Sequence, residues 1–190
     1  MRIKTETVKR SIFYAIAALA VVSTSQVGYS QAGSPGMSAA EQALAIEEIH
    51  QLKARYIRCM DMKDWVCWEG VFARDFQFKA GDLQFHSAKE MVQATHKTGL
   101  FERVKTVSHA ITPEITMLSP TTAKGSWGCD FLHYFPAGST AAQGQEIVAP
   151  GHWNHTDGYY YDTYVKIGGK WFIQSEEIHS LRETEGVLGK

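Results

Sequence analysis

The sequence is short of net charge and of cysteine, and both shortages exclude classes of protein. The 190 residues carry a formal net charge of -1, which gives no electrostatic basis for binding nucleic acid or an anionic membrane. There are 3 cysteines, with neither a Cys-x-x-Cys motif nor a cysteine and histidine cluster at zinc-binding spacing. Phosphate-binding motifs and internal repeats are absent as well. We therefore expect no nucleic-acid partner and no metal site.

An apolar run long enough to span a bilayer is also lacking. The run over residues 12–22 is too short to cross comfortably, and basic side chains at positions 2, 4, 9 and 10 precede it. Ser30 and Ala32 are small residues at the two positions that a signal peptidase reads. This pattern predicts a secretory signal peptide over residues 1–32 and a periplasmic or secreted protein. An uncleaved anchor is the alternative, and without twin arginines we do not expect Tat export.

The rest of the composition suits one globular domain. Hydrophobic residues make up 44% and charged residues 21% of the chain, which is enough for a normal core. We assign residues 33–37 to a linker, 38–182 to the domain and 183–190 to a C-terminal tail. The odd number of cysteines leaves at least one unpaired. Cys59 and Cys129 lie in apolar segments, so we favour buried thiols, with one disulfide as the alternative.

Periodicity and turn signals predict helices first and strands afterwards. Capping boxes begin at Ser38 and Ser87, each before a helical pattern. The expected elements are helices over 39–62 and 63–71, a hairpin over 76–79 and 83–85, a helix over 87–97, and strands over 107–117, 122–135, 155–167 and 170–181. This order predicts an α+β fold, with a cone-shaped, curved antiparallel sheet wrapped around the N-terminal helices and enclosing a pocket. Residues 136–150 read as a mobile loop, which leaves open whether they cover the pocket.

Acidic and imidazole side chains occupy positions that could face this pocket. Asp61 ends the apolar face of the first helix, and His109 lies near the start of a strand among small or apolar neighbours. His133 shares its strand alternation with apolar residues, whereas Asp130 lies on the other face of that strand. Each has a plain structural alternative, namely a surface acid at a helix end or a hydrogen-bonded histidine in the core.

The sequence His152-x-x-His155 is a weaker signal. It lies beside Asp157 and suggests a metal site, but it reads as a loop with no third ligand nearby. We therefore do not predict a metal there.

Several segments together resemble the SnoaL-like branch of the nuclear-transport-factor-2-like superfamily. The segments that carry the resemblance are residues 45–61, His109 with 113–116, 119–127 and 164–173. Within that branch the chain looks most like the group of bile-acid 7α-dehydratase, scytalone dehydratase and lindane dehydrochlorinase. The resemblance covers residues 38–182 and implies a cone fold, although the superfamily also includes binding modules and inactive proteins.

Site roles follow from this resemblance position by position. It implies a dyad in which Asp61 orients His109 as a general base, with no metal or cofactor. The remaining implied residues are Tyr56 and His133 in catalysis, and Tyr160, Trp127, Phe131, Asp130 and Arg182 in substrate binding. Tyr160 departs from the family pattern, in which an asparagine stands at that position, and Arg182 lies only near the expected arginine. These departures put the substrate in doubt.

The resulting hypothesis is a cofactor-independent lyase that eliminates water from a hydrophobic hydroxylated aromatic or polycyclic substrate. Because we expect export, a second form of the hypothesis is the reaction of those superfamily members that remove formaldehyde from lignin-derived diarylpropanes or phenylcoumarans. A cone that binds a small molecule without catalysis and an assembly module are the alternatives. We expect a homodimer or homotrimer, and no membrane partner after signal cleavage.

Overall fold

The computed structural model describes residues 36–97, 104–137 and 151–188. The chain separates into one unit over Met1–Gln31 and a second over Ala32–Lys190. The expected signal peptide, and residues 138–150 of the expected loop, lie outside the described residues. Everything below concerns the second unit, in which no described helix is long and apolar enough to cross a membrane.

The first two helices each begin at a residue whose side chain caps the helix N-terminus. Helix α1, Ala39–Asp61, begins at the predicted capping box, where the Ser38 amide donates to Glu41 Oε2 at 2.7 Å. Helix α2, Trp65–Glu69, begins where Asp64 Oδ1 accepts from the Cys67 amide at 3.0 Å. A Cys59–Cys67 disulfide joins the two helices, so the prediction of a free thiol at Cys59 was wrong. Cys129 is a free, buried thiol, as predicted.

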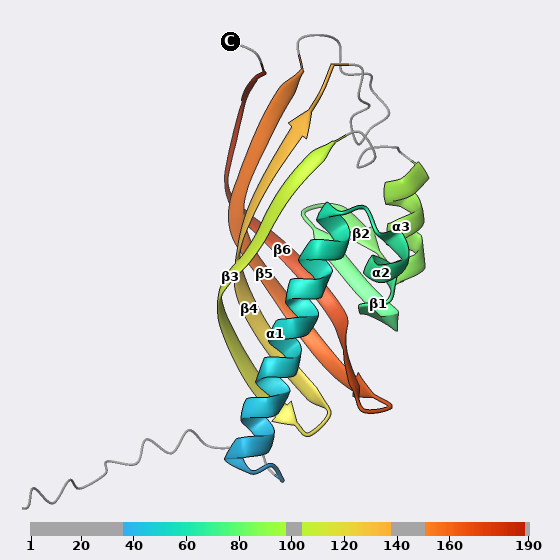
Figure 1. Ribbon diagram of the computed structural model, residues 1–190, viewed down its shortest axis with the longest axis vertical. Coiled ribbons are helices and arrows are strands. Elements are labelled where there is room, and N and C mark those ends of the chain that lie inside the picture. The colour runs from blue at the N-terminus through green and yellow to red at the C-terminus, as the bar shows by residue number, and fades with distance from the viewer. Residues whose placement is uncertain (1–35, 98–103, 138–150, 189–190) are drawn as a thin grey trace, which may run out of the picture. The chain divides into compact units, whose positions relative to one another are not determined.

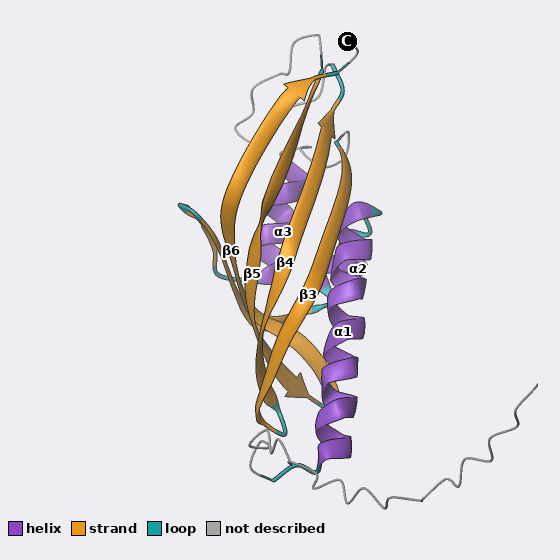
Figure 2. Cartoon of the chain, turned by 90° about the vertical axis from the view of Figure 1, so that its left-hand side faces the viewer, coloured by secondary structure: helices purple, strands orange, loops and turns teal. Residues whose placement is uncertain are grey.

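The strands form one curved, unclosed sheet beside these helices. The elements that follow are β1 Phe72–Ala80, β2 Leu83–Phe85, α3 Ala88–Lys97, β3 Lys105–Ser119, β4 Thr122–Phe135, β5 His152–Ile167 and β6 Lys170–Val187. The strand order is β2-β1-β6-β5-β4-β3, with α1 lying along the sheet and α3 beside the β1–β2 hairpin (Figures 1 and 2). The predicted α+β fold is therefore confirmed.

Two features of the sheet differ from the sequence prediction. Strand β1 pairs with β6 in parallel, which extends the predicted antiparallel meander by a long-range contact. Strand β6 continues to Val187, because β5 begins at His152 and offers partners along its whole length. Residues 183–187 are thus part of the sheet, although we had assigned them to a tail. In β3 the register with β4 shifts between Ile111 and Glu114, where Thr112 has a left-handed backbone with φ 46°.

The sheet has a face that packs on α1 and an outer face. The core includes Ile49 of α1, Phe76 of β1 and Ile173 of β6, all fully buried. Alternation along β5 buries Tyr160 and leaves its neighbours Tyr159 and Tyr161 exposed. We call these two sides the helix-facing face and the outer face.

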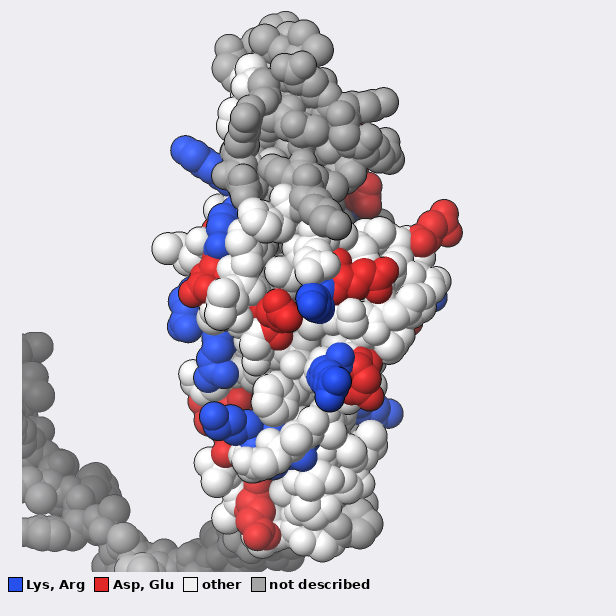
Figure 3. Space-filling view, turned by 90° about the vertical axis from the view of Figure 1, so that its right-hand side faces the viewer, with Lys and Arg blue, Asp and Glu red and all other residues white. Residues whose placement is uncertain are grey.

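Charged side chains of both signs are interspersed on the side of the molecule shown in Figure 3. This distribution agrees with the small net charge of the sequence, -1. On that side the charges therefore form no extended field of one sign.

Candidate active site

The end of α1 brings Asp61 against the start of β3. Its Oδ1 accepts hydrogen bonds from Thr106 Oγ1 at 2.8 Å and from Ser108 Oγ at 2.9 Å. Its Oδ2 accepts from the Ser108 backbone amide, also at 2.9 Å. Thr106 and Ser108 are two residues apart on one strand and therefore point to the same, helix-facing side. Asp61 is held as an acceptor at this end of the sheet.

His109 does not join Asp61, so the predicted dyad is not formed. Ser108 is 4% exposed, whereas the side chain of His109 is 55% exposed on the outer face. Its Nδ1 lies 3.3 Å from Oδ2 of Asp130, which is on the same outer face. Adjacent residues of a strand face opposite sides of the sheet. Ser108 faces Asp61, so the next residue, His109, points to the outer face.

Lys63 is part of the Asp61 site, and sequence reasoning missed it. It follows the helix in the left-handed region, with φ 59°, a conformation in which non-glycine residues are often found at functional sites. Its Nζ donates to Thr106 Oγ1 at 2.7 Å, and that hydroxyl in turn donates to Asp61. Burial lowers the pKa of Lys63 to about 8, although the charge of Asp61 acts in the opposite direction.

His133 of β4 faces the same side as Asp61 and Lys63. Burial lowers its pKa below the usual 6.5, and the charge of Lys63 lowers it further. A hydrogen-bonding contact with Asn154 and the charge of Asp61 act in the opposite direction. Asn154 lies directly across from His133 on β5. The imidazole is therefore neutral at pH 7 and can accept a proton.

Aromatic rings form one wall beside His133. The Phe131 ring stacks on the imidazole with centroids 6.1 Å apart, and the Phe135 ring meets it edge-on at the same separation. Phe131, for which contact with a substrate stays a prediction, lies beside His133. An acid, a lysine, a neutral histidine and apolar rings thus lie together on one side of the sheet.

A second polar cluster lies deeper, in the core. Lys53 is fully buried, and its Nζ lies 2.8 Å from Asp162 Oδ2 and 2.8 Å from Glu176 Oε2. Burial acts to lower the pKa of Lys53, but these two carboxylates outweigh burial and raise it. With one ammonium against two acids, burial raises the pKa of Glu176 to about 7. Glu176 therefore keeps its proton up to about pH 7.

Three predicted site residues belong to this core cluster instead of the Asp61 site. Tyr56 donates from its hydroxyl to Glu176 Oε1 at 2.8 Å, and burial followed by the charge of Glu176 raises its pKa well above the usual value. Trp127 Nε1 donates to the hydroxyl of Tyr164 at 2.7 Å. The ring of Tyr160 lies 3.5 Å from Lys53 Nζ, in cation–π contact. These side chains are buried, so we assign them to the core.

Two other predicted residues lie on the outer face. Asp130 contacts His109 and His155 there, and Arg182 Nε donates to Asp157 Oδ2 at 2.7 Å. Asp130 and Arg182 therefore do not share the Asp61 site, and their role in substrate binding stays a prediction. Alternation along β4 predicted that Asp130 and His133 lie on opposite faces, and the structure confirms that prediction.

A cleft of about 730 Å³ is lined mainly by exposed polar residues of several strands. Its lining includes Gln77, Lys79, Glu114, Lys124 and Tyr161, and does not include the Asp61 site. The lining also includes Asp162 and Glu176 of the core cluster. We take the Asp61 site as the candidate active site because Lys63 and His133, both with lowered pKa values, lie there together beside apolar rings.

Comparison with known proteins decides the family. The SnoaL-like domain matches residues 41–176. The chain belongs to the SnoaL-like family. This assignment agrees with the resemblance found in the sequence and with the cone-like arrangement of the sheet.

Solved structures of similar fold include enzymes of elimination chemistry. A candidate scytalone dehydratase from Novosphingobium aromaticivorans has a TM-score of 0.65 at 17% identity, over 77% of this chain and 91% of that one. A type 2 hexachlorocyclohexane dehydrochlorinase has a TM-score of 0.65 at 12% identity, over 80% and 94%. The type 3 enzyme from Novosphingobium barchaimii has a TM-score of 0.62 at 11% identity, over 78% and 94%. At these identities the likeness shows the fold of this SnoaL-like protein.

Proposed function

We propose that this SnoaL-like protein is a lyase that eliminates water from a hydrophobic hydroxylated substrate without a cofactor. The observation that carries the proposal is the pairing of a neutral His133 with a protonated Lys63 on one side of the sheet, around Asp61. Burial lowers the pKa of both groups, so near neutral pH the imidazole can take a proton and the lysine, with a pKa of about 8, can give one up. Elimination is also the chemistry named for the dehydrochlorinases of similar fold.

Each group has a defined part in the proposed step. The neutral imidazole of His133 takes a proton from a carbon next to the one that bears the hydroxyl group. The electron pair of that C–H bond forms a carbon–carbon double bond, and the C–O bond breaks. The ammonium of Lys63 protonates the departing oxygen, so that water leaves. Such proton transfers contribute roughly 10²–10⁴-fold to a rate.

Asp61 is a positioning residue in this scheme. Its carboxylate accepts from Thr106 and Ser108, and Thr106 accepts from Lys63, which fixes the lysine at the end of α1. A negative charge here also favours the protonated form of Lys63. The acid therefore supports the proton donor, whereas the family dyad would have it support the base.

The rings of Phe131 and Phe135 favour an apolar, flat substrate beside His133. We include hydroxylated steroids and lignin-type diaryl alcohols in this class. The export expected from residues 1–32 would place such a substrate outside the cytoplasm. Loss of formaldehyde together with water is the variant of the reaction that a diaryl alcohol with a terminal hydroxymethyl group permits.

The test is a product analysis with purified protein from which residues 1–32, the expected signal peptide, have been removed. The protein is incubated with a panel of hydroxylated steroids and diaryl alcohols, and product masses are recorded for the wild type and for His133→Ala. We expect a product lighter by one water, or by water plus formaldehyde, with the wild type and a large loss with the variant. Saturable binding of a panel member without any product would instead establish a binding cone and overturn the lyase.

A further inference from the structure

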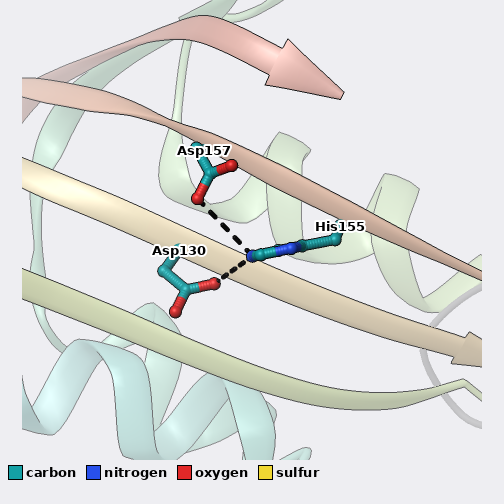
Figure 4. Close-up of side chains that lie close together, drawn as sticks. All are labelled: Asp130, His155 and Asp157. Atoms are coloured by element: carbon teal, nitrogen blue, oxygen red, sulfur yellow. Dashed lines mark hydrogen bonds and ion pairs between the residues drawn. The ribbon is translucent and has the colours of Figure 1, made fainter. Parts of the chain in front are cut away.

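Asp130, His155 and Asp157 form a compact group (Figure 4). They lie on the outer face, whereas Asp61 lies on the helix-facing side. Asp130 of β4 pairs directly with Asp157 of β5, and His155 lies two residues before Asp157 on the same face. One ligand atom from each side chain lies within 4.8 Å of the others. Among the described residues this is the one group of such ligands that could hold a metal ion.

The spacing of residues in the sequence did not predict this group. The pair His152-x-x-His155 suggests two ligands, but residues three apart on a strand point to opposite faces. The ring of His152 stacks on Phe135 with centroids 4.6 Å apart, so it does not join His155. The third ligand comes from β4, far away in the chain.

Each carboxylate presents one oxygen to His155 and has the other oxygen held by a basic side chain. His155 Nε2 lies 2.6 Å from Asp130 Oδ1 and 3.5 Å from Asp157 Oδ1. Asp157 Oδ2 accepts from Arg182 Nε at 2.7 Å, and Asp130 Oδ2 lies 3.3 Å from His109 Nδ1. Outer partners that orient ligand carboxylates in this way are a regular part of metal sites.

The charge and the distances suit a divalent transition-metal ion. Two carboxylates against the single guanidinium of Arg182 leave one net negative charge when the imidazoles are neutral. Two atoms bound to tetrahedral zinc at about 2.1 Å are about 3.4 Å apart, close to the separation of His155 Nε2 and Asp157 Oδ1. The contact between His155 and Asp130 is shorter, so it must open by about 0.8 Å to admit the ion.

We propose that Asp130, His155 and Asp157 bind one divalent transition-metal ion, with zinc as the probe. On binding, the neutral His155 carries its proton on Nδ1, so that Nε2 becomes a ligand, and each aspartate supplies one oxygen. The fourth position of the ion is open to water. The ion joins β4 to β5 on the outer face and stabilises the folded chain by mass action. The inference does not rest on the proposed function, because these side chains lie on the face opposite the Asp61 site.

The test is a titration of chelator-stripped protein with zinc chloride, followed by isothermal calorimetry and by thermal unfolding. We expect one equivalent bound with a dissociation constant in the micromolar range or below, and a higher unfolding temperature. His155→Ala and Asp157→Asn should each weaken binding by at least about 10-fold, because even outer partners of a metal site contribute this much. Circular dichroism checks that the variants are folded.

The matched control is His179→Ala. His179 lies on the same outer face and pairs with Glu177, Nε2 to Oε1 at 3.0 Å, in a pair that is not part of a metal-binding group among the described residues. This variant should bind zinc as the wild type does. Either the absence of saturable binding in the wild type, or equal binding in the wild type and Asp157→Asn, would overturn the proposed site.

Discussion

Ser108 donates two hydrogen bonds to Asp61, one from its hydroxyl and one from its backbone amide, both at 2.9 Å. In the pattern that the resemblance implies, His109 would occupy this place. The serine holds the acid without supplying a base. In the proposed step the base therefore comes from another strand, and His133 on β4 is an imidazole whose pKa responds to both Asp61 and Lys63.

The first prediction concerns which histidine is the base. His133→Ala should lower kcat for the elimination by roughly 10²–10⁴-fold, the usual contribution of general base catalysis. His109→Ala should lower it far less, because its imidazole is exposed on the other face of β3. The measurement is steady-state kinetics of both variants on whichever panel substrate turns over. Equal losses in the two variants would restore the Asp61/His109 dyad.

The second prediction concerns the pH dependence of kcat/KM. Activity should fall as the pH rises through about 8, because Lys63 then loses the proton that it gives to the leaving oxygen. Activity should also fall as the pH drops below the usual histidine value of 6.5, since a protonated His133 cannot act as a base. The two limbs together give a bell-shaped profile.

The substitution Lys63→Arg separates these limbs. A guanidinium stays protonated throughout this range, so the variant should lose the limb near pH 8 and keep the acid limb. His179→Ala, on the outer face, is the control and should keep the full bell. An unchanged alkaline limb in Lys63→Arg would remove Lys63 from the proposed step.

Much of the fold could be read from the sequence because its signals are local. The capping box at Ser38, the break between the last two strands after residue 167 and the strand Thr122–Phe135 depend on neighbouring residues, and the structure confirms the predicted position of each. The parallel pairing of β1 with β6 depends on contacts about one hundred residues apart in the chain, such as Phe78 with Glu176. Local periodicity carries no information about such a partner.

The candidate site could be predicted only in part, because the face of a strand changes with a shift of one residue. Asp61 and His133 were found from their places on an apolar helix face and an apolar strand face. His109 was chosen from its small or apolar neighbours and from the resemblance, but it lies one residue beyond Ser108, so its side chain points outward. Lys63 was missed because a lysine after a helix is usually a surface residue, and only its left-handed backbone brings it to Thr106.

The third prediction concerns the stability of the buried cluster. Lys53→Met removes the ammonium that lies between Asp162 and Glu176 and leaves two acids in the core. Loss of one partner from a buried ion pair costs about 3–5 kcal/mol, and we expect a fall of this size in the free energy of unfolding. Denaturant unfolding followed by circular dichroism measures it. Lys166→Met, which removes a partly exposed ion pair with Glu48, is the control and should cost no more than about 1 kcal/mol.

The fourth prediction concerns the proton on Glu176. Its pKa rises from the ordinary 4.5 to about 7 in the folded chain, so between these values the folded state binds more protons than the unfolded state. The contribution of this group to stability is fully present below pH 4.5 and is lost as the pH rises through about 7. Glu176→Gln carries a permanently neutral amide, whose single oxygen can accept from Lys53 or from Tyr56. The free energy of unfolding of the wild type should therefore decrease relative to that of Glu176→Gln across this range. A difference between the two proteins that stays constant from pH 4.5 to 7 would show that Glu176 keeps its charge beside Lys53.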